Sequence, residues 1–160
     1  MAPYVDFHTH RRSGDALEIL SVEALDEAQF AMAIESGQPF SVGVHPWHAA
    51  ENPEQLNEAF ERMERVVSGG RTVAIGECGL DWAVEVDRKL QAEVFERQFD
   101  MAKRYNLPII LHCVRAFEDV MLRLSRAKIE RAVFHSFVGS IQQAERVGVK
   151  VISARFRLVV

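Results

Sequence analysis

This sequence of 160 residues has only two cysteines, fewer Lys and Arg (19) than Asp and Glu (23), and no long apolar run. Two cysteines, Cys78 and Cys113, are too few for a disulfide scaffold, so we expect a reducing cytoplasm and two small buried apolar side chains. No apolar run approaches the ~20 residues that span a bilayer, and the N-terminus lacks the features of a signal peptide, so no membrane partner is expected. The net charge of −4 gives no general positive field for nucleic acid, so a phosphate would be held locally, by metal or by a few Arg and Lys.

Linkers rich in proline or serine, low-complexity tracts and fixed-period repeats are also absent, so residues 1–160 are expected to form one domain. Short apolar runs alternate instead with amphipathic periods over residues 56–67, 88–105 and 117–124. Continuous runs rich in Val and Ile are typical of parallel strands buried on both faces. Repeated strand–helix units predict an α/β fold whose parallel sheet is doubly wound or closed into a barrel. The predicted strands are Tyr4–Phe7, Phe40–Val44, Thr72–Ile75, Pro108–Leu111, Ala132–Phe134 and Val149–Ile152.

Groups that can bind a metal follow five of these runs. A single histidine beside a strand is usually structural, but five successive strands that end in His or Glu are hard to obtain by accident. In parallel α/β folds these strand ends meet on one face, where ligands bind. Histidines and carboxylates gathered there suit zinc, and also manganese or magnesium. The groups are His8, His10, His45, His48, Glu77, His112 and His135, which include all six histidines of the chain.

The spacing of these residues adds detail to the predicted site. His8 and His10 are two residues apart in a strand, so both side chains face the same way. Asp6, two residues before His8 in the same strand, also faces this way but lies deeper. We expect it to support a ligating imidazole rather than bind metal itself. Glu77 could bridge two ions, because a carboxylate offers two oxygens and an imidazole one free lone pair. The pattern favours a two-metal centre, in which paired ions activate water and stabilise the leaving oxygen of a phosphate ester.

Five short motifs follow one another along the chain. They are Asp6-Phe7-His8-Thr9-His10 (D-x-H-x-H), Gly43-Val44-His45-Pro46 (G-x-H-P), Gly76-Glu77-Cys78-Gly79-Leu80-Asp81 (G-E-x-G-L-D) followed by Gln91, Phe95 and Gln98, Leu107-Pro108-Ile109-Ile110-Leu111-His112 (L-P-x-x-x-H), and His135-Ser136-Phe137-Val138-Gly139 (H-x-F-x-G). In this order, from residue 5 to about residue 153, they resemble the TatD family of metal-dependent hydrolases. D-x-H-x-H alone is shared by several hydrolase groups, whereas G-E-x-G-L-D followed by H-x-F-x-G is specific.

This resemblance implies a TIM-barrel hydrolase that uses two divalent ions, zinc, magnesium or manganese. The implied ligands are His8 and His10 for one ion, Glu77 as the bridge that positions the attacking water, and His112 and His135 for the second ion. His45 and Arg115 are implied to contact the substrate phosphate. We expect Trp47 and His48 to be a packing pair in a loop, and Asp81 to turn the loop after Glu77 rather than bind metal.

Two features depart from the family pattern. The segment of residues 11–38 is short, and the family's second strand is hard to find in it. The family's final G-x-E-T-D motif, whose Asp would complete the first metal site, has no match in the sequence. We therefore expect an incomplete barrel of about six to seven βα units, against the eight units and ~250 residues of a typical one. A partner copy, a continuation of the chain or a terminal rearrangement would have to cover its open edges.

Hydrolysis of phosphodiester bonds, with DNA as the family-level substrate, is the leading functional interpretation. A different metal-dependent phosphoesterase that shares D-x-H-x-H is a second possibility, against which the more specific motifs stand. A third is a degenerate barrel fragment that binds metal or phosphate without turnover, which the absent acidic motif favours.

Overall fold

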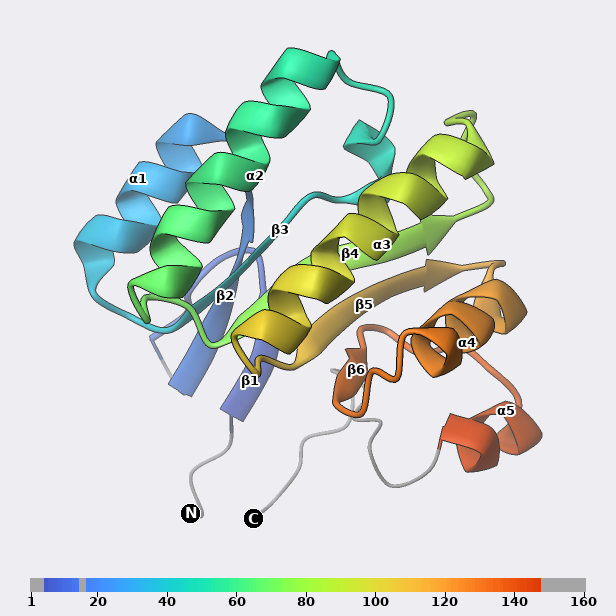
Figure 1. The fold of residues 1–160 in the computed structure, drawn as a ribbon. Coiled ribbons are helices and arrows are strands. Elements are labelled where there is room, and N and C mark those ends of the chain that lie inside the picture. The colour runs from blue at the N-terminus through green and yellow to red at the C-terminus, as the bar shows by residue number, and fades with distance from the viewer. Residues whose placement is uncertain (1–4, 15–16, 148–160) are drawn as a thin grey trace.

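The computed structural model describes residues 5–14 and 17–147, and within them six parallel strands form one curled sheet (Figure 1). The strands are β1 (Val5–Thr9), β2 (Leu17–Glu23), β3 (Phe40–Gly43), β4 (Ala74–Asp81), β5 (Ile109–Val114) and β6 (Ala132–Phe134). The helices are α1 (Glu27–Ser36), the short 3-10 helix η1 (Pro46–His48), α2 (Pro53–Ser68), α3 (Arg88–Arg104), α4 (Phe117–Arg126) and α5 (Ile141–Val147).

The strands follow one another in the sheet in the same order as in the chain. Figure 1 shows α1, α2 and α3 lying across one face of this sheet, as repeated strand–helix units require. The predicted α/β fold with a parallel, barrel-type sheet is therefore confirmed. In the described part of the chain β1 and β6 are the edges of the sheet, and their cover by a second copy stays a prediction. None of the described helices is long and apolar enough to cross a membrane.

The second strand, which is hard to find in the sequence, is present: Leu17–Glu23 forms β2 and pairs in parallel with both β1 and β3. Glu18, Ser21 and Val22 of this strand are buried, and Val22 is 1% exposed. The buried carboxylate of Glu18 accepts hydrogen bonds from the backbone N–H and hydroxyl of Ser13. Glu18 and Ser21 interrupt the apolar run, so the sequence pattern does not indicate a strand here. The predicted strand Val149–Ile152 lies outside the described residues.

The three amphipathic periods are confirmed as parts of α2, α3 and α4. The N-terminus of α2 has an Asn52 cap and Pro53 at the start, and α3 begins after Asp87, whose carboxylate accepts from two backbone N–H groups of the first turn. Phe60 of α2 and Phe95 of α3 are buried in the core between helices and sheet. Of the two free cysteines, Cys78 is fully buried as expected, whereas Cys113 is only half-buried.

Glycine is required where β4 passes β5. A Cβ atom on Gly76 would overlap the carbonyl oxygen of Ile110, and one on Gly79 would overlap the carbonyl oxygen of His112. Both glycines have positive φ, 134° and 153°. The two strands therefore approach too closely for a side chain at either glycine. Glu77 occupies one of the two positions of β4 between Gly76 and Gly79.

We expect Gly79→Ala to lower the free energy of unfolding by about 1–3 kcal/mol more than Gly70→Ala, which is the range for overpacked interiors. Gly70 also has a positive φ, 67°, but a Cβ there meets nothing within 4 Å. The control therefore measures only the cost of a left-handed backbone, ~1–2 kcal/mol. Urea unfolding of both variants gives the comparison, and equal losses would show that β4 and β5 can separate at no cost.

Candidate metal centre

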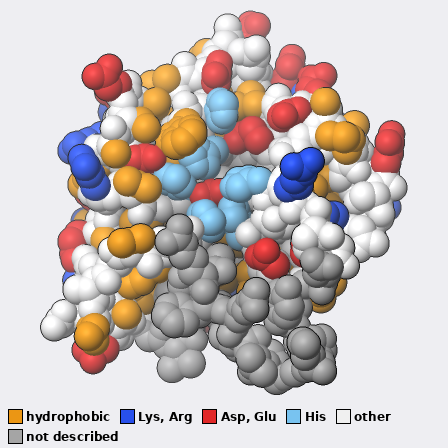
Figure 2. All heavy atoms as spheres, turned by 180° about the vertical axis from the view of Figure 1, so that it is seen from behind, with side chains coloured by type: hydrophobic (Ala, Val, Ile, Leu, Met, Phe, Trp, Pro, Cys, Tyr) orange, Lys and Arg blue, Asp and Glu red, His pale blue; other side chains and the backbone are white. Residues whose placement is uncertain are grey.

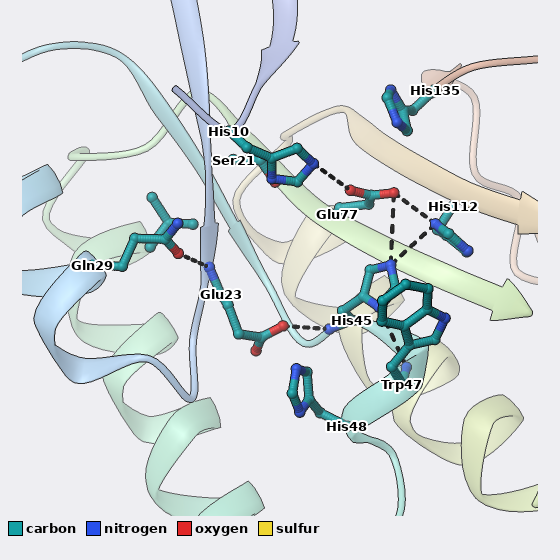
Figure 3. A pocket seen from close by; sticks show the side chains of 11 residues that line it. His10, Ser21, Glu23, Gln29, His45, Trp47, His48, Glu77, His112 and His135 are labelled. Atoms are coloured by element: carbon teal, nitrogen blue, oxygen red, sulfur yellow. Dashed lines mark hydrogen bonds and ion pairs between the residues drawn. The ribbon is translucent and has the colours of Figure 1, made fainter. Parts of the chain in front are cut away.

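Six of the seven predicted metal-binding groups meet at the carboxyl ends of the strands. Figure 2 shows the histidines gathered in a hollow on one face, with carboxylates between them. The hollow is a cavity of about 320 Å³. Its lining includes His10, His45, Glu77, His112 and His135, and Figure 3 shows these side chains turned toward one another. His8 lies beneath them with 1% of its side chain exposed.

Glu77 of β4 is the centre of this arrangement. Its residue is 6% exposed, and its two oxygens face opposite groups of imidazoles. One oxygen, Oε2, is 3.0 Å from Nε2 of His8 and 3.7 Å from Nε2 of His10. The other, Oε1, is 2.7 Å from Nδ1 of His112 and 3.8 Å from Nε2 of His45.

The donor atoms form two groups that share Glu77 and differ in part from the expected grouping. One group contains His8, His10 and His135, and the other contains His45 and His112. His135 was expected beside His112, but its ring centroid is 3.9 Å from that of His8. His45, expected only at the substrate, has its Nε2 3.1 Å from Nδ1 of His112.

The protonation of these histidines suits metal binding. Burial and then the neighbouring imidazole lower the pKa of His45 and of His135 to about 4, and the same causes lower the pKa of His10. These rings are therefore neutral at pH 7 and keep a lone pair for a ligand bond. Burial alone would raise the pKa of Glu77, but hydrogen bonds from His112 and His8 outweigh it, so the pKa is lowered and the carboxylate is ionised.

The residues present fit divalent ions. Nε2 of His8 is 3.1 Å from Nε2 of His10, the same separation as in the pair formed by His45 and His112. Imidazole nitrogens that face one another so closely can converge on a shared cation, which uses both lone pairs when each ring is deprotonated. Burial alone would lower the pKa of His112, but its hydrogen bonds with Glu77 and Asp81 outweigh burial and raise the pKa, so a cation bound there would displace a proton. Nitrogen and carboxylate donors around one point are a set that zinc accepts, and other first-row ions accept it as well.

Two buried glutamines of α3 hold the strand ends that carry the site. Gln98 accepts from the backbone N–H of Val44 at 3.0 Å and donates to its carbonyl at 3.1 Å, next to His45. Gln91 accepts from the N–H of Asp81 at 2.8 Å and donates to its carbonyl at 2.9 Å. Each amide thus replaces a missing strand neighbour and satisfies two buried backbone groups, which fixes the direction of β3 and β4 at the cavity.

Asp81 does more than turn a loop. One of its oxygens accepts from the N–H of Ala83, as expected for a turn. The other is 3.0 Å from Nε2 of His112 and accepts from the indole N–H of Trp47 at 2.8 Å. Asp81 therefore fixes the ring of His112 with Nδ1 directed to Glu77. The interpretation of Trp47 as a packing residue was wrong, because Trp47 is 56% exposed and lines the cavity together with His48.

Asp6 contacts a main-chain group rather than an imidazole ring, and Arg115 lies outside the histidine hollow. The carboxylate of Asp6 accepts from the backbone N–H of His8 at 3.1 Å, so it supports the main chain of this residue. Nδ1 of His8 is buried without a hydrogen-bond partner among the described residues. Arg115 is exposed and lines a neighbouring cavity instead of the histidine hollow.

Glu23 is the cavity residue that the sequence analysis missed. It ends β2, and its carboxylate accepts from the backbone N–H of His45 at 2.9 Å and of Leu25 at 3.2 Å. Burial raises the pKa of Glu23, although the hydrogen bonds from His45 and Leu25 oppose this effect. The signal was available, since an acid at the end of a strand is the pattern that identified Glu77, but β2 itself had not been found.

The strand ends of a parallel half-barrel, with histidines around a buried glutamate, define a barrel of the metal-dependent hydrolase type. The family described as TatD related DNase matches residues 20–154, and this chain belongs to it. The uncharacterized metal-dependent hydrolase YjjV of Escherichia coli is 36% identical over 134 residues, which cover 79% of this chain and 50% of YjjV. The 3'-5' ssDNA/RNA exonuclease TatD of Erwinia tasmaniensis is 34% identical over 74% of this chain and 48% of its own length.

Solved structures give the same result for the fold. The crystal structure of Escherichia coli YjjV matches with a TM-score of 0.77 and 25% identity, over 94% of this chain and 66% of that one. A TatD family hydrolase from Entamoeba histolytica matches with a TM-score of 0.76 at 17% identity, over 96% of this chain and 65% of that one. The resemblance to the family and its barrel fold is therefore confirmed. This chain spans about half the length of the curated relatives that it matches.

We expect Glu77→Gln to reduce the bound metal more than His45→Ala, because Glu77 belongs to both donor groups and His45 to one. The amide keeps the shape of the side chain but removes the negative charge between two cations. Elemental analysis after dialysis against zinc or manganese measures the metal bound per chain. Glu35→Gln, an exposed substitution on α1, is the matched control. Equal losses in the two site variants would contradict the central role of Glu77.

We expect Asp81→Asn to weaken metal binding about 10–100-fold, the usual effect of losing a group that orients a ligating imidazole. Trp47→Phe removes only the indole N–H and leaves the Asp81–His112 contact, so its effect should be smaller. Competition with a chromogenic chelator gives both affinities. If Asp81→Asn binds metal as tightly as the unchanged chain, the orientation of His112 does not depend on Asp81.

Proposed function

We propose that this chain carries the two-metal centre of a hydrolase that cleaves phosphodiester bonds in single-stranded nucleic acid. The observation that supports it most directly is the position of Glu77, whose two oxygens face two separate groups of imidazoles. The names of relatives, among them 3'-5' ssDNA/RNA exonucleases, agree with this substrate class.

In this proposal His8, His10 and His135 would hold one divalent ion and His112 the other, and Glu77 belongs to both donor groups. The ions would supply positive charge for the phosphate and lower the pKa of water. In the reaction, water oxygen bonds to phosphorus, the bond from phosphorus to the leaving sugar oxygen breaks, and a proton passes to that oxygen. His45 lines the cavity with its Nε2 3.1 Å from Nδ1 of His112, so in this proposal it would belong with His112 to the second donor group.

The proposed turnover is slow, because the acids at the cavity already have partners. Glu77 faces His8 and His112, Asp81 faces His112 and Trp47, and Glu23 accepts from two backbone N–H groups. A positioned general base typically contributes ~10²–10⁴-fold in rate. Because these acids already accept hydrogen bonds, none of them is placed as a general base that removes the proton of the attacking water.

A labelled single-stranded oligonucleotide, incubated with purified chain and Mn²⁺, Mg²⁺ or Zn²⁺, tests the activity. We expect cleavage that chelator abolishes and that Glu77→Gln lowers ~10²–10³-fold, the range for removal of one preorganised electrostatic group. Glu35→Gln should retain the full rate. Equal rates for the chain and Glu77→Gln would assign the activity to a contaminant.

Binding without turnover is the second candidate, and the occupied acids favour it. In that case the chain retains metal and binds the oligonucleotide in a gel-shift assay, but no product forms with any of the three ions. A small phosphomonoester serves as the comparison substrate, and release of phosphate from it alone would identify a different phosphoesterase.

A further inference from the structure

A second cavity of about 550 Å³ adjoins the metal centre at the same edge of the sheet. Three of its lining residues directly follow residues of the histidine cluster in the chain. Trp82 follows Asp81 at the end of β4, Cys113 follows His112 on β5, and Ser136 follows His135 after β6. The two cavities are therefore lined by neighbouring residues of the same strand ends, such as His112 and Cys113 on β5.

The backbone around this cavity is held in costly conformations. Arg115 and Ser136 both adopt the left-handed region, with φ of 53° and 48°. Neither is glycine, so each conformation costs of the order of 1 kcal/mol or more, and strained residues concentrate at ligand sites. They lie on adjacent loops and line the same cavity.

Polar groups of the cavity also lack protein partners. The exposed guanidinium of Arg115 makes neither a hydrogen bond nor an ion pair within the described residues. The nearby acid Glu118 is already paired with Arg146, at 2.6 and 2.9 Å, so Arg115 keeps an uncompensated charge. The indole N–H of Trp82 is buried, and among the described residues it has no acceptor.

The remaining walls are apolar and aromatic. Phe137 lines the cavity and packs edge-on against Phe134, with ring centroids 5.9 Å apart. Phe117 lies next to it at 6.0 Å. A cavity of this kind, with apolar and aromatic walls and the unpaired cation of Arg115, suits a flat heterocycle that carries a phosphate. Nucleic-acid bases stack on such aromatic side chains regardless of their sequence.

We infer that this second cavity binds the nucleobase of a nucleotide next to the phosphate that is cleaved, while Arg115 binds the backbone phosphate of that nucleotide. The inference rests on the proposed function and adds to it a subsite for the base. It explains why Arg115 lines this cavity and not the histidine hollow, because the phosphate that Arg115 binds is next to the phosphate that is cleaved.

The first experiment compares a thymidine oligonucleotide with an abasic strand of the same length, by fluorescence anisotropy. We expect the base-bearing strand to bind roughly tenfold more tightly, since stacking of one base on an aromatic side chain has about that effect. Phe137→Leu should remove most of this difference. Arg115→Ala should weaken the binding of both strands, whereas Arg126→Ala, an exposed arginine of α4 outside the cavity, should not.

Equal affinity of the chain for both strands would overturn the base subsite but leave the proposed function intact, provided that metal-dependent cleavage is present. If the chain prefers the base-bearing strand but cleaves nothing, the base subsite stands and only the proposed cleavage is contradicted. If neither strand binds, the proposed function and the subsite both fail.

The second experiment needs neither metal nor turnover. The chain has two tryptophans, so Trp47→Phe leaves Trp82 as its one indole fluorophore. Titration with thymidine 5'-monophosphate should change the fluorescence of Trp82 to saturation, and deoxyribose 5-phosphate should not. The nucleotide should also protect Cys113 from a thiol reagent, with buried Cys78 as the internal reference. An unchanged emission and unprotected Cys113 at saturating nucleotide would contradict the inference.

Discussion

The buried charge of Glu77 is the constraint around which the other features are arranged. A carboxylate that is 6% exposed destabilises the fold unless donors surround it, and imidazoles from two different strands, β1 and β5, provide them. Bringing Nδ1 of His112 within 2.7 Å of a Glu77 oxygen requires β4 and β5 to lie very close together. Gly76 and Gly79 permit this approach, since neither has a Cβ atom to hold the strands apart.

The position of the site could be predicted from the sequence, because apolar strands that end in histidine or glutamate must display these residues at one edge. The strand β2 could not, since Glu18 and Ser21 break its apolar pattern while being buried in the fold. The pairing of the histidines was also beyond the sequence. It depends on ring orientation and on the curvature of the sheet, which bring His135 beside His8 rather than His112.

Orientation within the site comes mainly from bonds between side chains and the main chain. Asp6 supports the N–H of His8, and Glu23 supports the N–H of His45. Such contacts leave no signature in the spacing of motifs, because either partner can be replaced if the backbone group finds another acceptor. This explains why the residue types of the site were identified more completely than the groups that hold them in place.

The two glutamines of α3 have a consequence for how the chain can vary in length. Gln91 and Gln98 are seven residues apart, which is two helical turns, so both amides face the sheet. Inserting or deleting one residue between them would rotate one amide by about 100° and leave the backbone of Val44 or Asp81 without its partner. Changes of length should therefore accumulate in the segments before Arg88 and after Arg104, and the heptad between the glutamines should remain intact among proteins that keep this cavity.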